Sequence, residues 1–118
     1  MLSVKLIDLI NEAYKTADEH GWHSINRTFG DLIALCHGEL SEALEEYRDG
    51  GLNKDNLIYY KNDKEGNIKP EGVAVEIADL LIRVFDLCKD MDIPIIDALK
   101  IKMEYNKLRP YLHGGKKI

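Results

Sequence analysis

The chain has 118 residues, of which 45% are hydrophobic and 31% are charged, and its formal net charge is -5 at pH 7. This length and this apolar fraction predict one folded domain spanning residues 1–118. The negative charge argues against a general nucleic-acid or membrane binder, because affinity for phosphate backbones requires clustered cations over a broad surface.

The first predicted element is an amphipathic helix that ends near residue 20. Apolar side chains recur at helical spacing over residues 6–17, Ser3 is placed to cap the helix, and Gly21 is placed just beyond its end. A short connector follows, in which the only tryptophan, Trp22, stands beside His23. An aromatic side chain in a connector either covers the core or stacks on a base, and both interpretations of Trp22 stay open here.

A second helix is predicted from about Phe29 to Arg48. Thr28 with Asp31 three residues later resembles a capping box, and a glycine pair ends the helix. The following segment, residues 52–69, is compatible with a loop or with a small hairpin that turns at residues 63–66.

Two further helices complete the predicted fold. Pro70 suits the first turn of a third helix, which continues to about Asp90. Asp92 is placed to cap a fourth helix, Pro94 suits its first turn, and Pro110 forces its end. The sequence therefore predicts an all-α fold.

The cysteines and the absence of long apolar runs bear on the location of the protein. Cys36 and Cys88 each fall on an apolar helix face without a neighbouring cysteine, which favours buried reduced thiols over a disulfide or a zinc site. Residues 2–10 are interrupted by Lys5 and Asp8, unlike a signal peptide, and no apolar run approaches the roughly 18 residues of a membrane span. We therefore expect a soluble cytoplasmic protein with no membrane partner.

An acidic pattern repeats on the second and third predicted helices. Glu39 and Glu42 lie along one flank of an apolar stripe on the second helix. Glu76 and Asp79 hold the same angular offset from a stripe on the third helix. The two stripes consist of Leu40, Ala43, Leu44 and Tyr47, and of Val73, Ile77, Leu81, Val84 and Cys88. If the stripes pack together, the four carboxylates converge and repel one another unless a hard cation lies among their oxygens.

This repeat predicts a metal site. Four carboxylates on adjacent turns suit Mg²⁺, or Mn²⁺ as a substitute, with room for phosphate oxygens and water. A carboxylate di-iron site is disfavoured, because it requires a histidine three residues after a glutamate and none of the four histidines stands there. The alternative is a solvated acidic face of the kind common on surface helices.

A basic constellation lies near the end of the sequence. Lys102, Asn106 and Arg109 share one face of the fourth helix, and the segment HGGK at residues 113–116 ends in Lys116. Lysine and arginine can grip phosphate oxygens, and a glycine pair can offer backbone N–H groups to an anion. The alternative is a basic helix end stabilised by the helix dipole and followed by a frayed tail.

Three segments resemble the motif series of the MazG-like nucleoside triphosphate pyrophosphohydrolases. They are GELSEALEEYR at residues 38–48, VEIADLLIR at residues 75–83 and KMEYNKLRPYLHGGK at residues 102–116. These enzymes belong to an all-α superfamily that also includes helical dUTPases, dCTPases and phosphoribosyl-ATP pyrophosphatase. The resemblance covers the chain from about Trp22 to Lys116.

The resemblance implies a fold, an assembly and a set of site residues. The fold is a four-to-five-helix bundle, assembled as a homo-oligomer, either a dimer or a tetramer, with its sites near the subunit interfaces. By that resemblance the Mg²⁺ ligands are Glu39, Glu42, Glu76 and Asp79, the phosphate contacts are Lys102, Asn106, Arg109 and Lys116, and Trp22 with His23 lies by the base or sugar.

Together these observations predict a Mg²⁺-dependent pyrophosphohydrolase that converts a nucleoside triphosphate to the monophosphate and pyrophosphate. A glutamate that binds the metal weakly, or lies just outside its ligands, would accept the proton of the attacking water. Glu42 and Glu46 are the candidate catalytic residues, and an ion pair between Glu46 and Arg83 is the alternative role for Glu46. The competing functions are the same fold acting on dUTP, dCTP or another specialised nucleotide, and a non-catalytic helical interaction module.

Overall fold

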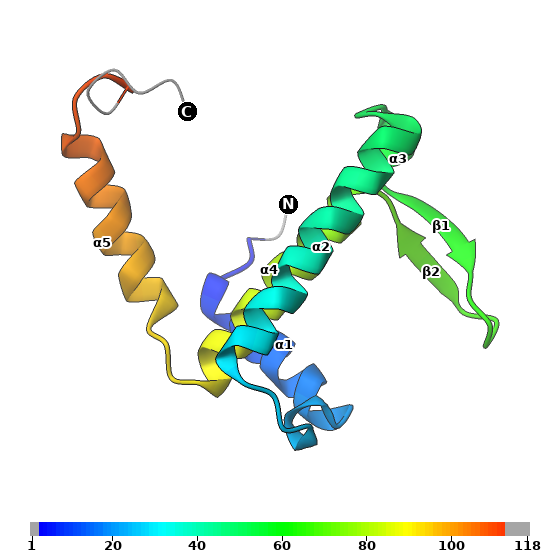
Figure 1. Cartoon of the computed structure of the whole chain (residues 1–118), viewed down its shortest axis with the longest axis horizontal. Coiled ribbons are helices and arrows are strands. Elements are labelled where there is room, and N and C mark those ends of the chain that lie inside the picture. Colours follow the sequence, from blue (N-terminus) through cyan, green and yellow to red (C-terminus); the bar gives the residue numbers. More distant parts are fainter. Residues whose placement is uncertain (1–2, 113–118) are drawn as a thin grey trace.

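The computed structural model describes residues 3–112 and is mostly helical (Figure 1). The elements in chain order are α1 (Leu6–Glu19), a 3-10 turn η1 (Trp22–Ser24), α2 (Phe29–Gly50), α3 (Lys54–Leu57), β1 (Tyr59–Asn62), β2 (Ile68–Glu71), α4 (Val73–Asp90) and α5 (Ile95–Leu108). The predicted helical character is confirmed. Of the two forms left open for the middle segment, the hairpin is present, and β1 pairs antiparallel with β2.

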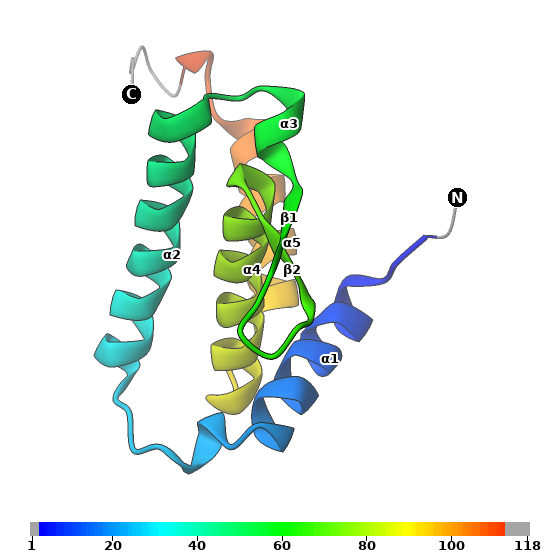
Figure 2. The same cartoon turned by 90° about the vertical axis from the view of Figure 1, so that its right-hand side faces the viewer.

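The long central helices are α2 and α4, which run antiparallel side by side, and α1 packs across α4 (Figure 2). Between α2 and α4, Cys36, Leu87 and Cys88 form a buried cluster. Partly buried apolar residues surround it, namely Leu32, Leu80, Val84, Ile93 and Ile95. Both cysteines are free and buried, as the sequence predicts.

The start of α2 follows the predicted capping box. The Asp31 N–H donates to the Thr28 hydroxyl oxygen at 3.1 Å, and the Thr28 N–H donates to the Asp31 carboxylate at 2.9 Å. Gly21 also takes its predicted place after α1, with a left-handed φ of 79° that glycine adopts without a steric penalty. These local signals therefore fix the connector between α1 and α2.

Two other predicted starts are wrong. Helix α1 begins at Leu6 after Lys5, so Ser3 lies outside it and does not cap it. Pro70 lies in β2 opposite Tyr60 rather than in a helix. The fixed φ and the missing N–H of proline suit an unpaired strand edge as well as a first helical turn. In this chain Pro70 lies in the strand.

The starts of α4 and α5 also differ from the prediction. Helix α4 begins after Gly72, which has a φ of 118° and whose added Cβ would collide with the carbonyl oxygen of Leu57. Asp92 adopts a φ of 54° in the turn after α4, and Pro94 precedes the first turn of α5 instead of lying in it. A tight turn with a left-handed residue therefore replaces the predicted aspartate cap.

Only part of each predicted apolar stripe is buried between α2 and α4, which corrects the predicted interface. On α2 the buried positions are Cys36, Glu39 and Ala43, whereas Leu40 and Leu44 are 49% and 47% exposed. Small side chains at Cys36 and Ala43 let the helices approach closely along the acidic edge instead. On α4 the buried positions are Val73, Glu76, Leu87 and Cys88, whereas Ile77 and Leu81 are exposed.

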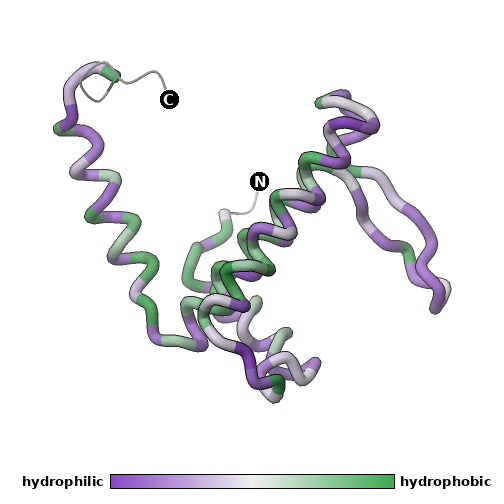
Figure 3. The backbone as a smooth tube through the Cα atoms, in the orientation of Figure 1, coloured by the Kyte–Doolittle hydropathy of each residue, from purple (hydrophilic) through white to green (hydrophobic). Residues whose placement is uncertain are grey.

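Helix α5 stands apart from the other helices (Figure 1). Hydrophobic and hydrophilic positions alternate along it (Figure 3), and Ile101, Met103 and Leu108 are largely exposed. The radius of gyration is 17.1 Å, against about 13–14 Å for a compact domain of this size. Within one chain, the bundle is therefore formed by α1, α2 and α4 alone. None of the helices in residues 3–112 has the length and hydropathy needed to cross a bilayer.

Candidate functional site

Three carboxylates meet between α2 and α4. One oxygen from each of Glu39, Glu42 and Glu76 lies within 4.8 Å of the other two. Glu39 and Glu76 are each only 8% exposed, and the Oε2 atom of each has no hydrogen-bond partner among the described residues. An ionised, buried and unpartnered carboxylate oxygen is costly, so this cluster requires either a proton or a cation.

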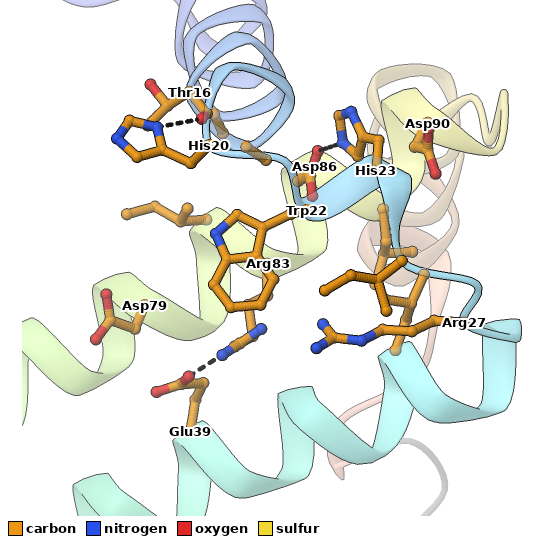
Figure 4. A pocket seen from close by; sticks show the side chains of 16 residues that line it. Thr16, His20, Trp22, His23, Arg27, Glu39, Asp79, Arg83, Asp86 and Asp90 are labelled. Atoms are coloured by element: carbon orange, nitrogen blue, oxygen red, sulfur yellow. Dashed lines mark hydrogen bonds and ion pairs between the residues drawn. The ribbon is translucent and has the colours of Figure 1, made fainter.

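The fourth predicted ligand, Asp79, follows Glu76 by one helical turn and lines the same pocket as Glu39 (Figure 4). It is not among the three carboxylates with oxygens within 4.8 Å of one another. Burial, followed by the negative charge of Glu39, raises the pKa of Asp79. The electrostatics thus couple all four predicted acids, although the geometry brings three of them together.

Arg83 pairs with Glu39, with its Nε donating to Oε1 at 2.6 Å (Figure 4). The predicted alternative, an ion pair between Arg83 and Glu46, is therefore wrong. Because α2 and α4 run antiparallel, a late position on α4 faces an early position on α2, and Glu46 lies two turns too far along. Arg83 neutralises part of the cluster while leaving the other oxygen of Glu39 unpartnered.

Glu76 is the most perturbed acid of the cluster. Burial, followed by the interaction with the neighbouring carboxyl group of Glu42, raises the pKa of Glu76 to about 7. In the absence of a cation, a proton on Glu76 therefore relieves the repulsion between the carboxylates.

Glu76 also belongs to a second carboxylate group, with Glu46 of α2 and Glu71 of β2, whose ligand oxygens again lie within 4.8 Å of one another. The Tyr59 hydroxyl donates to both oxygens of Glu46, at 2.9 and 3.0 Å. This hydrogen bond, with burial and nearby negative charge, raises the pKa of Tyr59 to about 12. Sequence spacing did not find Glu71, because it lies on a hairpin that carries no acidic repeat.

A pocket of about 430 Å³ opens beside the cluster, lined by residues of α1, η1, α2 and α4. Trp22 and His23 lie in it together with Glu39 and Asp79, so this part of the predicted constellation is assembled (Figure 4). The Arg27 guanidinium lies 5.1 Å from the centre of the Trp22 ring. Trp22 remains 49% exposed, which leaves its ring available for stacking.

His23 ties α1 to α4 instead of facing the pocket with free nitrogens. Its Nε2 lies 2.7 Å from Asp86, its Nδ1 lies 3.0 Å from Asp18, and its ring packs against Tyr14. Burial lowers the pKa of His23, but the hydrogen bonds with Asp86 and Asp18 outweigh it, so the pKa is raised. Asp86 was missed from the sequence, although its place seven residues after Asp79 puts both on one helix face.

Three of the four predicted phosphate contacts do not reach the carboxylates within one chain. Lys102, Asn106 and Arg109 lie on or at the end of α5, which diverges from α2 and α4 (Figure 1). Lys102 Nζ and the Arg109 guanidinium lie 4.9 and 5.8 Å from the centre of the Tyr105 ring. Lys116 lies outside the described residues.

The donor set fits a hard divalent cation. Carboxylates supply oxygen ligands, and a bound cation would give the unpartnered oxygens of Glu39 and Glu76 the partner that they lack. Comparisons with protein-family models, with curated proteins and with solved structures find no match for this chain.

Proposed function

We propose that the protein is a Mg²⁺-dependent pyrophosphohydrolase that converts a nucleoside triphosphate, ribo or deoxy, to the monophosphate and pyrophosphate. The observation that carries the proposal is the pair of buried carboxylate oxygens, on Glu39 and Glu76, that lack any partner among the described residues. Glu39 also lines a pocket that holds an exposed tryptophan. Acids for a metal and an aromatic face for a base are what a nucleotide hydrolase requires at one site.

The ligands would be Glu39, Glu42 and Glu76, joined by Asp79 from the next turn. When bound there, Mg²⁺ would neutralise phosphate oxygens and make a water molecule more acidic. Trp22 would hold the base by stacking, and Arg83 would fix the orientation of Glu39 through its hydrogen bond.

The candidate bases are the two glutamates predicted from sequence. Glu42 belongs to the cluster and is exposed, so it can reach a water molecule at the mouth of the site. Glu46 is less exposed and receives the Tyr59 hydroxyl on both oxygens, which fixes its position. Glu42 is therefore the better base, and Glu46 is better suited to hold a fixed orientation.

We also propose that the active form is a homo-oligomer, a dimer or a tetramer. On each of α2 and α4 the apolar stripe lies at the same angle from the acidic edge. Because the two helices run antiparallel and approach each other along these edges, the exposed parts of both stripes lie on the same side and make one apolar face. A second copy would cover this face, and its α5 would bring Lys102, Asn106 and Arg109 toward the acidic cluster. The two buried free cysteines fit a reducing compartment, for which we propose the cytoplasm.

The test is a hydrolysis screen over ribo- and deoxynucleoside triphosphates, including dUTP and dCTP, with and without Mg²⁺. Wild type should release pyrophosphate from at least one of them only when Mg²⁺ is present, and Glu76→Gln should abolish this. Glu45→Gln is the matched control, because Glu45 is exposed on α2 and pairs with Arg48 away from the cluster. Mg²⁺-dependent turnover that survives in Glu76→Gln would refute the site, and no turnover of any nucleotide would refute the activity.

A further inference from the structure

The hairpin brings a carboxylate to the cluster that the proposed Mg²⁺ site does not use. Glu71 ends β2, and its side chain is only 17% exposed although the hairpin itself projects from the helices (Figure 1). Its ligand oxygen lies within 4.8 Å of those of Glu46 and Glu76. Three separate elements, α2, β2 and α4, therefore direct one carboxylate each to this point.

The charge at this point is not balanced by the described residues. Lys69 is the cation paired with Glu71, at 3.2 Å, and its side chain is 59% exposed, so water screens much of its charge. Arg83 is engaged by Glu39 at the other end of the cluster. The carboxylates of this second group thus face one another with a single solvated cation nearby.

The burial of Glu76 also points to a ligand here. Glu76 is more than nine-tenths buried, and its Oε2 has no hydrogen-bond partner among residues 3–112. The same side chain offers a ligand atom to both carboxylate groups, so it stands between them. Tyr59 holds Glu46 through both carboxylate oxygens, which keeps that side chain directed toward the group without supplying any positive charge.

We propose that Glu46, Glu71 and Glu76 form a second divalent-cation site, and that the Glu76 carboxylate bridges it to the cation held by Glu39 and Glu42. The inference rests on the proposed function, since it adds a cation to the same cluster. Mg²⁺ and Mn²⁺ are the fitting ions, because all the donors are hard oxygens. The site also gives the hairpin a role, because through Glu71 it supplies a ligand to the cation.

The test counts Mn²⁺ bound per chain at equilibrium, by the electron paramagnetic resonance signal of free Mn²⁺. Wild type should bind two ions per chain, and Glu71→Gln and Glu46→Gln, altered on different elements, should each bind one. Two controls should keep both ions. Lys69→Met removes the ion pair to Glu71 but leaves the carboxylate, and Glu65→Gln neutralises an exposed acid in the turn between β1 and β2. Circular dichroism confirms that each variant is folded.

The outcomes separate this inference from the proposed function. One ion per chain in wild type would overturn the second site and leave the first standing. Two ions retained in Glu71→Gln would overturn the assignment of Glu71 as a ligand. No bound ion in wild type would overturn both the second site and the metal centre of the proposed enzyme. Loss of one ion in Lys69→Met would show that the ion pair between Lys69 and Glu71, and not ligation by Glu71, supports ion binding. It would also overturn the assignment of Glu71 as a ligand.

Discussion

Replacing Glu76 with glutamine should stabilise the metal-free protein at neutral and alkaline pH. The pKa of Glu76 rises from 4.5 to about 7 on folding, because of burial first and the nearby Glu42 second. The folded state therefore binds this proton more tightly than the unfolded state does. The contribution of Glu76 to the unfolding free energy is fully present below pH 4.5 and is lost as pH rises through about 7. The difference in pKa corresponds to about 3 kcal/mol of unfolding free energy lost by pH 8.

The assay is urea unfolding in the presence of a chelator at several pH values between 4.5 and 8. Other groups titrate over the same range, so the informative quantity is the difference between wild type and Glu76→Gln. Glutamine keeps the shape of a protonated glutamate and does not ionise, so this difference should grow with pH by about 3 kcal/mol. Saturating Mg²⁺ should reduce it, because a cation at the cluster replaces the proton in wild type but not in the variant.

A flat difference between the two proteins across this pH range would refute the reasoning, since it would mean that Glu76 ionises without cost in the folded state. The control is Glu45→Gln, which removes an exposed carboxylate from the neighbouring helix. Its difference from wild type should stay within a few tenths of a kcal/mol at every pH, as expected for a surface ion pair.

Three further predictions concern the tie between α1 and α4, the exposed apolar face and the basic helix. His23→Gln should destabilise the protein by about 2 kcal/mol at pH 5.5 in thermal or urea unfolding. The loss of stability should fade as pH rises through the raised pKa of His23, because only the protonated ring donates to both aspartates. A loss of stability that does not change with pH would contradict this. Leu44→Glu should lower the mass measured by light scattering to that of a monomer while Glu45→Gln leaves it unchanged, and a monomeric wild type would refute the oligomer. Arg109→Ala should lower kcat/KM, with a loss of roughly 1–3 kcal/mol of transition-state stabilisation. Truncation after Leu112 should weaken nucleotide binding with little change in melting temperature. Wild-type kinetics in both variants would mean that the phosphates are held elsewhere.

Local signals in the sequence predicted the elements well. The long helices, the capping box at Thr28 and the glycine after α1 each depend on residues within one or two turns of one another, so spacing alone reveals them. The acidic repeat, which follows the helical period, predicted that four carboxylates would converge, and three of them, Glu39, Glu42 and Glu76, have oxygens within 4.8 Å of one another.

The sequence could not show which face of each helix turns inward. Periodicity marks an apolar stripe as the core, yet in this chain the acidic edge of α2 packs on α4 and Leu40 and Leu44 are half exposed. A stripe that would be buried against a second copy has the same pattern as one buried within a chain, so pattern alone cannot distinguish them.

The remaining misses arise from contacts between residues distant in sequence. Glu71 reaches the cluster only because the hairpin folds back on α4, and Asp86 meets His23 across 63 positions of the chain. Pro70 was assigned to a helix because proline suits a first helical turn and an edge strand equally. Each of these depends on tertiary packing, which no local pattern encodes.

The central claim is that the acidic cluster holds Mg²⁺ for the hydrolysis of a nucleoside triphosphate to the monophosphate and pyrophosphate. Phosphorus NMR of the triphosphate favoured in the screen, followed over time with enzyme and Mg²⁺, tests it most directly because it identifies both products. We predict equal amounts of monophosphate and pyrophosphate in wild type, and no reaction with Glu42→Gln, with Asp79→Asn or with a chelator present. Formation of the diphosphate and inorganic phosphate, or undiminished hydrolysis by the two variants, would contradict the account.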